Sequence, residues 1–96
     1  MLILKTLTLG PAHGYAIARH VERVSSEVLL IGESSLYPAL QRLLVNDWVK
    51  AEWGESELGR RARIYRITAA GRKRLTQEAE AFVRITEAIT AVMEAQ

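Results

Sequence analysis

The 96-residue chain contains no cysteine. Without thiols it cannot form disulfides, use a cysteine nucleophile or build a thiolate zinc site. It also lacks an apolar run of the roughly 20 residues that a membrane-spanning helix needs. The stretch from Leu2 to Leu9 is short, contains Lys5 and ends at Gly10-Pro11, without the basic leader and cleavage site of a signal peptide. We therefore expect a core helix there, no membrane contact and a cytoplasmic protein.

Residue combinations typical of catalysis are missing as well. The sequence has no carboxylate pair, no nucleophile beside a base and no glycine-rich phosphate loop at a persuasive spacing. Its two histidines, His13 and His20, lie about two helical turns apart, which is too far to share one ion without other ligands. We expect no enzyme activity, no metal and no cofactor.

Length and charge point to one domain with a local basic surface. A chain of 96 residues builds a single core, and its 49% hydrophobic and 25% charged residues are ordinary for a globular domain. The net charge is only +2, but seven of the 13 Lys and Arg residues fall between Arg60 and Arg74, a stretch without Asp or Glu. The distribution of charge is therefore more informative than its total.

Two amphipathic helices follow the first one. The earlier runs from about His13 to Ser26, and its helical spacing of apolar residues predicts that Tyr15 belongs to the core. The later begins near Ser35 and ends at Asn46-Asp47, with Pro38 in the first turn, where proline is tolerated. The preceding polar residues are its N-cap candidates: Glu33, Ser34 and Ser35.

Three strands and a last helix complete the predicted elements. Val28 to Ile31 suits a brief buried strand, or a prolonged helix, and Trp48 to Trp53 with Arg61 to Ile67 form a hairpin. The polar segment Gly54 to Arg60 joins the hairpin strands, and Trp48 and Trp53 lie on opposite faces, so only one can meet the core. A long helix then runs from about Ala69 to the C-terminus, capped by Thr68.

This order of elements predicts a mainly α, mixed α+β fold, namely a winged helix-turn-helix with a long C-terminal dimerisation helix. In such a fold the recognition helix is the one just before the hairpin, or wing. We expect residues 1–67 to form the DNA-binding region and residues 68–96 the dimerisation helix, within one structural domain.

Three motifs resemble those of the PadR family of bacterial regulators, in the order of that family. They are Gly10-Pro11-Ala12-His13-Gly14-Tyr15, then Ser35-Leu36-Tyr37-Pro38-Ala39-Leu40 with Arg42-Leu43, then Tyr65-Arg66-Ile67-Thr68 with Gly71. The resemblance implies a winged-helix homodimer joined through its C-terminal helix, which represses at paired half-sites. The C-terminal region is short because it consists of this single helix, and in this respect it resembles the smaller subgroup of the family. One departure is Asn46-Asp47, where the family usually has an acidic residue and glycine, which puts the geometry of that turn in doubt.

The candidate DNA-binding residues lie on the third helix and the wing. On the helix, Gln41 and Arg42 can make paired hydrogen bonds to base edges, whereas the smaller hydroxyl groups and the tyrosine suit phosphates. The alternative is a merely solvated face, or pairing of the wing arginines with Glu55 and Glu57. The full set is Ser34, Ser35, Tyr37, Gln41, Arg42, Arg60, Arg61 and Arg63.

The last helix carries a heptad seam that predicts dimerisation, because its apolar residues alternate in steps of four and three. The alternative is a helix folded back on its own core. The seam residues are Leu75, Ala79, Phe82, Thr86, Ile89 and Met93.

The sequence thus favours a homodimeric regulator, expected to repress, that binds double-stranded DNA at a two-fold symmetric operator. A small aromatic effector is a possible further partner. The competing hypothesis is a winged-helix module for protein contact, whose wing arginines meet an acidic partner; the salt dependence of DNA binding discriminates the two.

Overall fold

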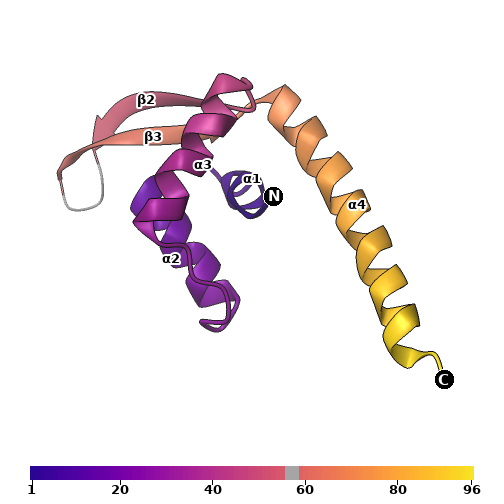
Figure 1. Ribbon diagram of the computed structural model, residues 1–96. Helices are drawn as coiled ribbons and strands as arrows, with labels where there is room; N and C mark the ends of the chain where they lie inside the picture. The colour runs from indigo at the N-terminus through magenta and orange to yellow at the C-terminus, as the bar shows by residue number, and fades with distance from the viewer. Residues whose placement is uncertain (56–58) are drawn as a thin grey trace.

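The computed structural model describes residues 1–55 and 59–96. Its elements follow the predicted order of three helices, a hairpin and a long helix, with one small additional strand (Figure 1). They are α1 (Leu2–Leu7), β1 (Ala12–His13), α2 (Gly14–Val24), α3 (Glu33–Val45), β2 (Val49–Glu55), β3 (Arg61–Ile67) and α4 (Ala69–Glu94). The predicted fold class, a mixed α+β winged helix-turn-helix with a long C-terminal helix, is confirmed.

The sheet has three antiparallel strands in the order β1-β3-β2. Strand β1 pairs through Ala12 with Tyr65, and the wing strands β2 and β3 pair from Val49↔Ile67 to Glu55↔Arg61. The expectation of a short strand at Val28–Ile31 is wrong, because this segment lies outside the sheet.

A local turn explains why Val28–Ile31 is not a strand. Ser26 and Glu27 have positive φ values of 53° and 66°, which turn the chain sharply after α2. The Ser25 hydroxyl then accepts a hydrogen bond from the Leu29 amide at 3.0 Å, so this backbone group is satisfied locally. Val28 is 79% exposed, and only Ile31 of this run packs against the core.

The core gathers one face of each of the first three helices and the inner half of the wing. Leu4 and Ile17 are fully inaccessible to solvent. The expected core position of Tyr15 is wrong, since its side chain is 68% exposed. Ile17, two residues further along, takes the core position. Two residues along a helix correspond to a rotation of about 200°, so Tyr15 points away from the core. The core consists of Ile3, Leu4, Leu7, Ile17, Leu36, Leu40, Val49, Tyr65 and Ile67.

Helix α3 begins two residues earlier than expected. Its N-cap is Gly32, whose carbonyl accepts hydrogen bonds from the Ser35 and Leu36 amides at 3.0 and 2.9 Å, and no side chain caps the helix. Pro38 therefore lies beyond the first turn, contrary to expectation. The missing amide leaves the Ser34 carbonyl without its helical partner, which is tolerable because Ser34 is exposed to water.

The turn after α3 keeps the geometry that glycine normally provides. Asp47 adopts a left-handed φ of 58°, a conformation that Asp and Asn tolerate better than most residues. The Asn46 side-chain amide donates to the Arg42 carbonyl at 2.8 Å, and Thr68 Oγ1 donates to the Asp47 carbonyl at 2.7 Å. The departure at Asn46-Asp47 therefore leaves the entry into the wing intact.

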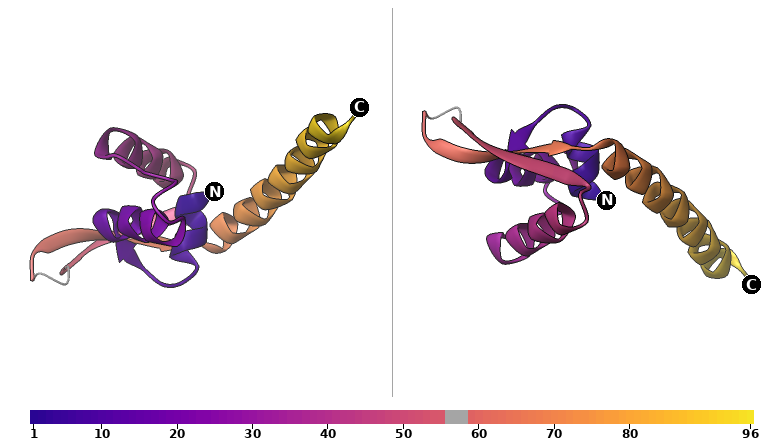
Figure 2. Two further views of the ribbon diagram at one scale, coloured as in Figure 1. Left: turned by 90° about the horizontal axis from the view of Figure 1, so that it is seen from below. Right: turned by 90° about the horizontal axis from the view of Figure 1, so that it is seen from above.

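Helix α4 is fixed to the body at its first turns and then projects away from it, on the opposite side from the wing (Figure 2). The predicted Thr68 cap is confirmed, since its hydroxyl accepts from the Gly71 amide at 2.9 Å. A Cβ atom on Gly71 would lie 2.0 Å from the Trp48 carbonyl oxygen, so only glycine allows this approach. The Arg74 guanidinium covers the Trp48 ring at 4.8 Å from its centroid.

Among the described residues, no helix has both the length and the apolar character needed to span a bilayer.

An ionic contact at the base of α4 gives a small pH-dependent contribution to stability. Partial burial raises the pKa of Glu78, but hydrogen bonds from the Met1 ammonium and from Arg74 outweigh this effect and hold the pKa below its ordinary value. The nitrogen-to-oxygen distances are 3.0 Å to Met1 and 2.8 Å to Arg74. Because the folded pKa is depressed, this contribution is present above the unfolded pKa of about 4.3 and is lost as pH falls through the folded value.

We therefore expect Glu78→Gln to lower the melting temperature slightly at pH 7 and to have no effect once the pH is below the folded pKa. The measurement is thermal unfolding by circular dichroism across this pH range. Glu80→Gln, which removes the same charge from an exposed position, is the control and should show no such pH-dependent difference. A loss that persists at low pH would show that packing, and not charge, explains the effect.

Candidate nucleic-acid interface

The solvent-facing side of α3 carries every candidate that the sequence placed on this helix. The opposite side holds Leu36 and Leu40, which are 2% and 1% exposed, so the core fixes the orientation of the helix. Helical geometry then turns the polar side chains outward together, as a continuous surface. The exposed residues of this surface are Ser34, Ser35, Tyr37, Gln41 and Arg42.

Tyr37 is supported by the first residue of α2. A Cβ atom on Gly14 would lie 3.3 Å from Tyr37 Cε1 and 3.5 Å from the Tyr37 hydroxyl, so the ring rests over the start of that helix. Half of the Tyr37 side chain remains exposed. The contact with Gly14 supports the Tyr37 ring, and the Tyr37 hydroxyl lies at the edge of the polar surface of α3.

Two arginines of the wing, Arg61 and Arg63, lie on one face. Trp53 lies opposite Arg63 and Glu55 opposite Arg61, so these four side chains share the face that carries Tyr65 into the core. The Arg61 guanidinium lies 4.7 Å, and that of Arg63 5.9 Å, from the centre of the Trp53 ring. All four side chains are exposed.

Arg60 is exposed just before β3. Of the two carboxylates expected to pair with the wing arginines in the alternative reading, Glu57 lies outside the described residues. For Glu55, the ion pairs found among residues 1–55 and 59–96 do not include one to Arg61 or Arg63. On the other face of the wing, Arg66 pairs with Glu52. The basic stretch therefore divides into a carboxylate-paired face and a face where the arginines meet an aromatic ring.

The role of Trp53 in this surface was not predicted. Only one of the two tryptophans could meet the core, and Trp48 does so, while Trp53 is 61% exposed. Alternation along a strand puts Arg61 and Arg63 on one face of β3, but it does not determine which face of β2 lies opposite them. That depends on the register across Gly54–Arg60, which composition does not determine.

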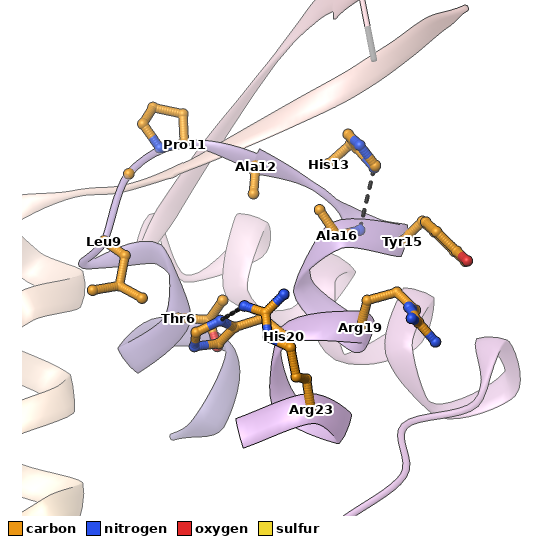
Figure 3. A pocket seen from close by; sticks show the side chains of 11 residues that line it. Thr6, Leu9, Pro11, Ala12, His13, Tyr15, Ala16, Arg19, His20 and Arg23 are labelled. Atoms are coloured by element: carbon orange, nitrogen blue, oxygen red, sulfur yellow. Dashed lines mark hydrogen bonds between the residues drawn. The ribbon is translucent and has the colours of Figure 1, made fainter. Parts of the chain in front are cut away.

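A hollow beside α2 was also not predicted. It has a volume of about 430 Å³ and is open to solvent between the turn after α1 and the outer side of α2 (Figure 3). His13 Nδ1 accepts from the Ala16 amide at 3.3 Å, and His20 Nδ1 lies 3.4 Å from an Arg23 nitrogen, so the two histidines have separate local partners. No group of three or more metal-ligating His, Cys, Asp or Glu residues occurs within the described part of the chain.

Helix α4 exposes most of its predicted seam. Phe82 and Ile89 are 56% and 58% exposed, and Met93 is 79% exposed. Thr86 is also exposed, whereas Leu75 packs partly against the core of its own chain. The alternative of a helix folded back entirely on its own core is therefore wrong, because Gly71 is its only buried residue.

A family comparison and a comparison with solved structures both indicate transcriptional regulators. The model of the PadR-like family of transcriptional regulators matches residues 3–77, which include α3 and the wing. The chain resembles the structure of a transcriptional regulator from Clostridium thermocellum, with 32% identity and a TM-score of 0.85 over 93% of this chain and 86% of that one. Its fold is also similar to a PadR family transcription regulator from Clostridium difficile, with 23% identity and a TM-score of 0.81 over 96% of this chain and 94% of that one.

A curated relative is a 37.1 kDa transposon protein of Streptomyces fradiae, which is 42% identical over 86 residues, or 90% of this chain. The chain spans 23% of the length of that relative. The similarity therefore covers nearly all of this chain but less than a quarter of that protein.

Proposed function

The chain belongs to the PadR-like family of transcriptional regulators, and on this basis we propose that it is a homodimeric repressor of a two-fold symmetric operator in double-stranded DNA. The observation that carries the proposal is the exposed polar surface of α3 beside a wing that carries Arg61 and Arg63 on one exposed face. A recognition helix enters the major groove, and the wing contacts the adjacent backbone or minor groove.

The residues divide by the chemistry that each can perform. Gln41 and Arg42 have the amide and guanidinium groups that can make paired hydrogen bonds to base edges. The hydroxyl groups of the α3 surface suit phosphates, and so do the guanidinium groups of the wing arginines. In this proposal the phosphate-contacting residues are Ser34, Ser35, Tyr37, Arg60, Arg61 and Arg63.

Dimerisation through α4 would give the protein two recognition helices. Residues 68–96 supply the interface in this proposal, and residues 1–67 supply the DNA contacts. A two-fold symmetric dimer spaces its recognition helices about one turn of DNA apart, roughly 34 Å, which matches paired half-sites. A small aromatic effector that releases the repressor stays a prediction, since it requires a cleft formed between two protomers.

Arg42→Ala is expected to weaken binding to the operator by about 1–3 kcal/mol, because a guanidinium that reads a base edge is lost. Binding to random DNA should change little. Fluorescence anisotropy with both DNAs measures the difference. Equal losses on the two DNAs would instead assign Arg42 to the phosphate contacts.

Arg61→Ala provides the contrasting variant. A lost phosphate contact weakens binding to both DNAs alike and reduces the slope of log affinity against log salt by about one unit. If the slope is unchanged, Arg61 does not contact the backbone.

Footprinting of the purified protein on the DNA just upstream of its own gene tests the function as a whole. A protected, two-fold repeated site is the expected result and would also indicate self-regulation. Binding that is insensitive to both salt and sequence would contradict the proposal.

A further inference from the structure

Trp53 is a large aromatic residue in a position where the fold does not need it. Its side chain is 61% exposed on the wing, away from the core cluster, while Trp48 packs against that cluster. An exposed indole gains little from the hydrophobic effect. Its contacts are instead with two cations, since the guanidinium carbons of Arg61 and Arg63 lie 4.7 and 5.9 Å from the ring centre.

The strand register explains how one ring reaches both arginines. Arg63 is directly opposite Trp53 in the antiparallel pair, and Arg61 is the diagonal neighbour on the same face. Directly opposed side chains have Cβ atoms about 5 Å apart, and a diagonal neighbour is within reach of an aromatic ring. Two like charges two residues apart on a strand repel one another, and the negative face of the indole offsets this repulsion.

We propose that Trp53 is a positioning residue of the wing, which holds the guanidinium groups of Arg61 and Arg63 on one face so that they meet the DNA backbone already ordered. The inference rests on the proposed function and deepens it, because it names the residue that organises the wing contact. An arginine side chain loses rotamer entropy when it is fixed in one position. Stacking on the ring orders each side chain before binding, which reduces the part of that loss incurred on DNA.

Arg61 and Arg63 lie on the face of the sheet that packs against the helices. Val49, Tyr65 and Ile67 continue it inward, and they pack with Leu40 of α3 in the core. The wing therefore extends the helical side of the sheet past the body (Figure 1). A duplex lying along α3 would meet this side of the wing first.

The test compares Trp53→Leu with Trp53→Phe in operator binding over a salt series. Leucine removes the π face but keeps an apolar side chain, and we expect it to weaken affinity about two- to fivefold, the range of an exposed cation–π contact. The salt slope should stay unchanged because both arginines remain. Phenylalanine keeps a π face and should restore most of the affinity.

The arginine background separates positioning from direct contact. In Arg61→Ala with Arg63→Ala, the further change Trp53→Leu should have no effect, since nothing remains to be positioned. Wild-type affinity of Trp53→Leu, or a full additional loss in the double-alanine background, would overturn the proposal. Equal melting temperatures of the Trp53 variants are expected from the exposure of the ring.

A measurement on the free protein distinguishes failure of this inference from failure of the proposed function. In a Trp48→Phe background, Trp53 is the only tryptophan. Removing Arg61 and Arg63 should increase quenching of its fluorescence by acrylamide, because the ring loses its cover. Unchanged quenching overturns the stack itself, whereas a wild-type protein that binds no DNA overturns the proposed function.

Discussion

Replacing both Phe82 and Ile89 with glutamate is expected to convert the protein into a monomer that no longer protects its operator. The two side chains are 56% and 58% exposed in the single chain and lie on the same face of α4, seven residues apart. A further strip of exposed apolar residues flanks them, and a soluble domain rarely leaves so large a patch uncovered. This strip consists of Val83, Ile85 and Val92, and the seam residue Met93 is exposed as well.

The size of the effect follows from the loss of the second DNA-binding unit. In a dimer the second domain binds at a high effective concentration, which raises affinity about 10²- to 10⁴-fold over a single domain. Two carboxylates buried in the seam remove this gain because desolvating an unpaired charge is too costly. Sedimentation at micromolar concentration and footprinting measure the two consequences separately.

A matched control adds the same charge elsewhere on the helix. Gln77→Glu with Ala91→Glu places two carboxylates on the opposite, exposed face of α4. This variant should remain dimeric and protect the operator. Our account of α4 is wrong if the Phe82 and Ile89 variant stays dimeric, or if a proven monomer still protects both half-sites with full affinity.

The second large effect is expected from Gly71→Ala. The added methyl group would lie 2.0 Å from the Trp48 carbonyl oxygen and 2.9 Å from Ile67 Cγ1. The backbone oxygen cannot turn aside as a flexible side chain can, so α4 and the start of β2 must separate. Overpacking of this kind costs about 1–3 kcal/mol, sometimes more. For a domain of this size, we expect the melting temperature to fall on the order of 10 °C.

Gly32→Ala is the control for this substitution. No atom lies within 4 Å of a Cβ at Gly32, and its φ of −79° suits any residue. Its effect should stay within about 1 kcal/mol, because alanine is a poorer N-cap but also restrains the unfolded chain. Similar melting temperatures for both variants would show that the contact at Gly71 is not tight in solution.

The elements that the sequence predicted well are those with a local cause. The Thr68 cap, the hairpin strands and the long α4 depend on neighbouring residues, and the structure contains all three. The error at Val28–Ile31 has a distant cause in addition to the local turn at Ser26 and Glu27. Val28–Ile31 has the composition of a strand, but β1 at Ala12–His13 occupies the available edge of β3 instead.

In the candidate site, too, the features with a local cause were predicted and those that depend on strand pairing were not. The outward position of the α3 candidates depends only on helical periodicity, and they are exposed as a group. Whether they contact DNA stays a prediction. The clustering of Trp53 with Arg61 and Arg63 depends on the register between β2 and β3, which no local pattern encodes.

The rigid attachment of α4 also gives the molecule a lever. Its 26 residues extend about 39 Å at 1.5 Å per residue, and the contact of Gly71 with the Trp48 backbone acts as the fulcrum at one end. A tilt of about 10° at this fulcrum displaces the far end by about 7 Å, or about two base-pair steps along a duplex. If the protein dimerises along α4 as proposed, we expect the angle between α4 and the body at Gly71 to influence the distance between the half-sites.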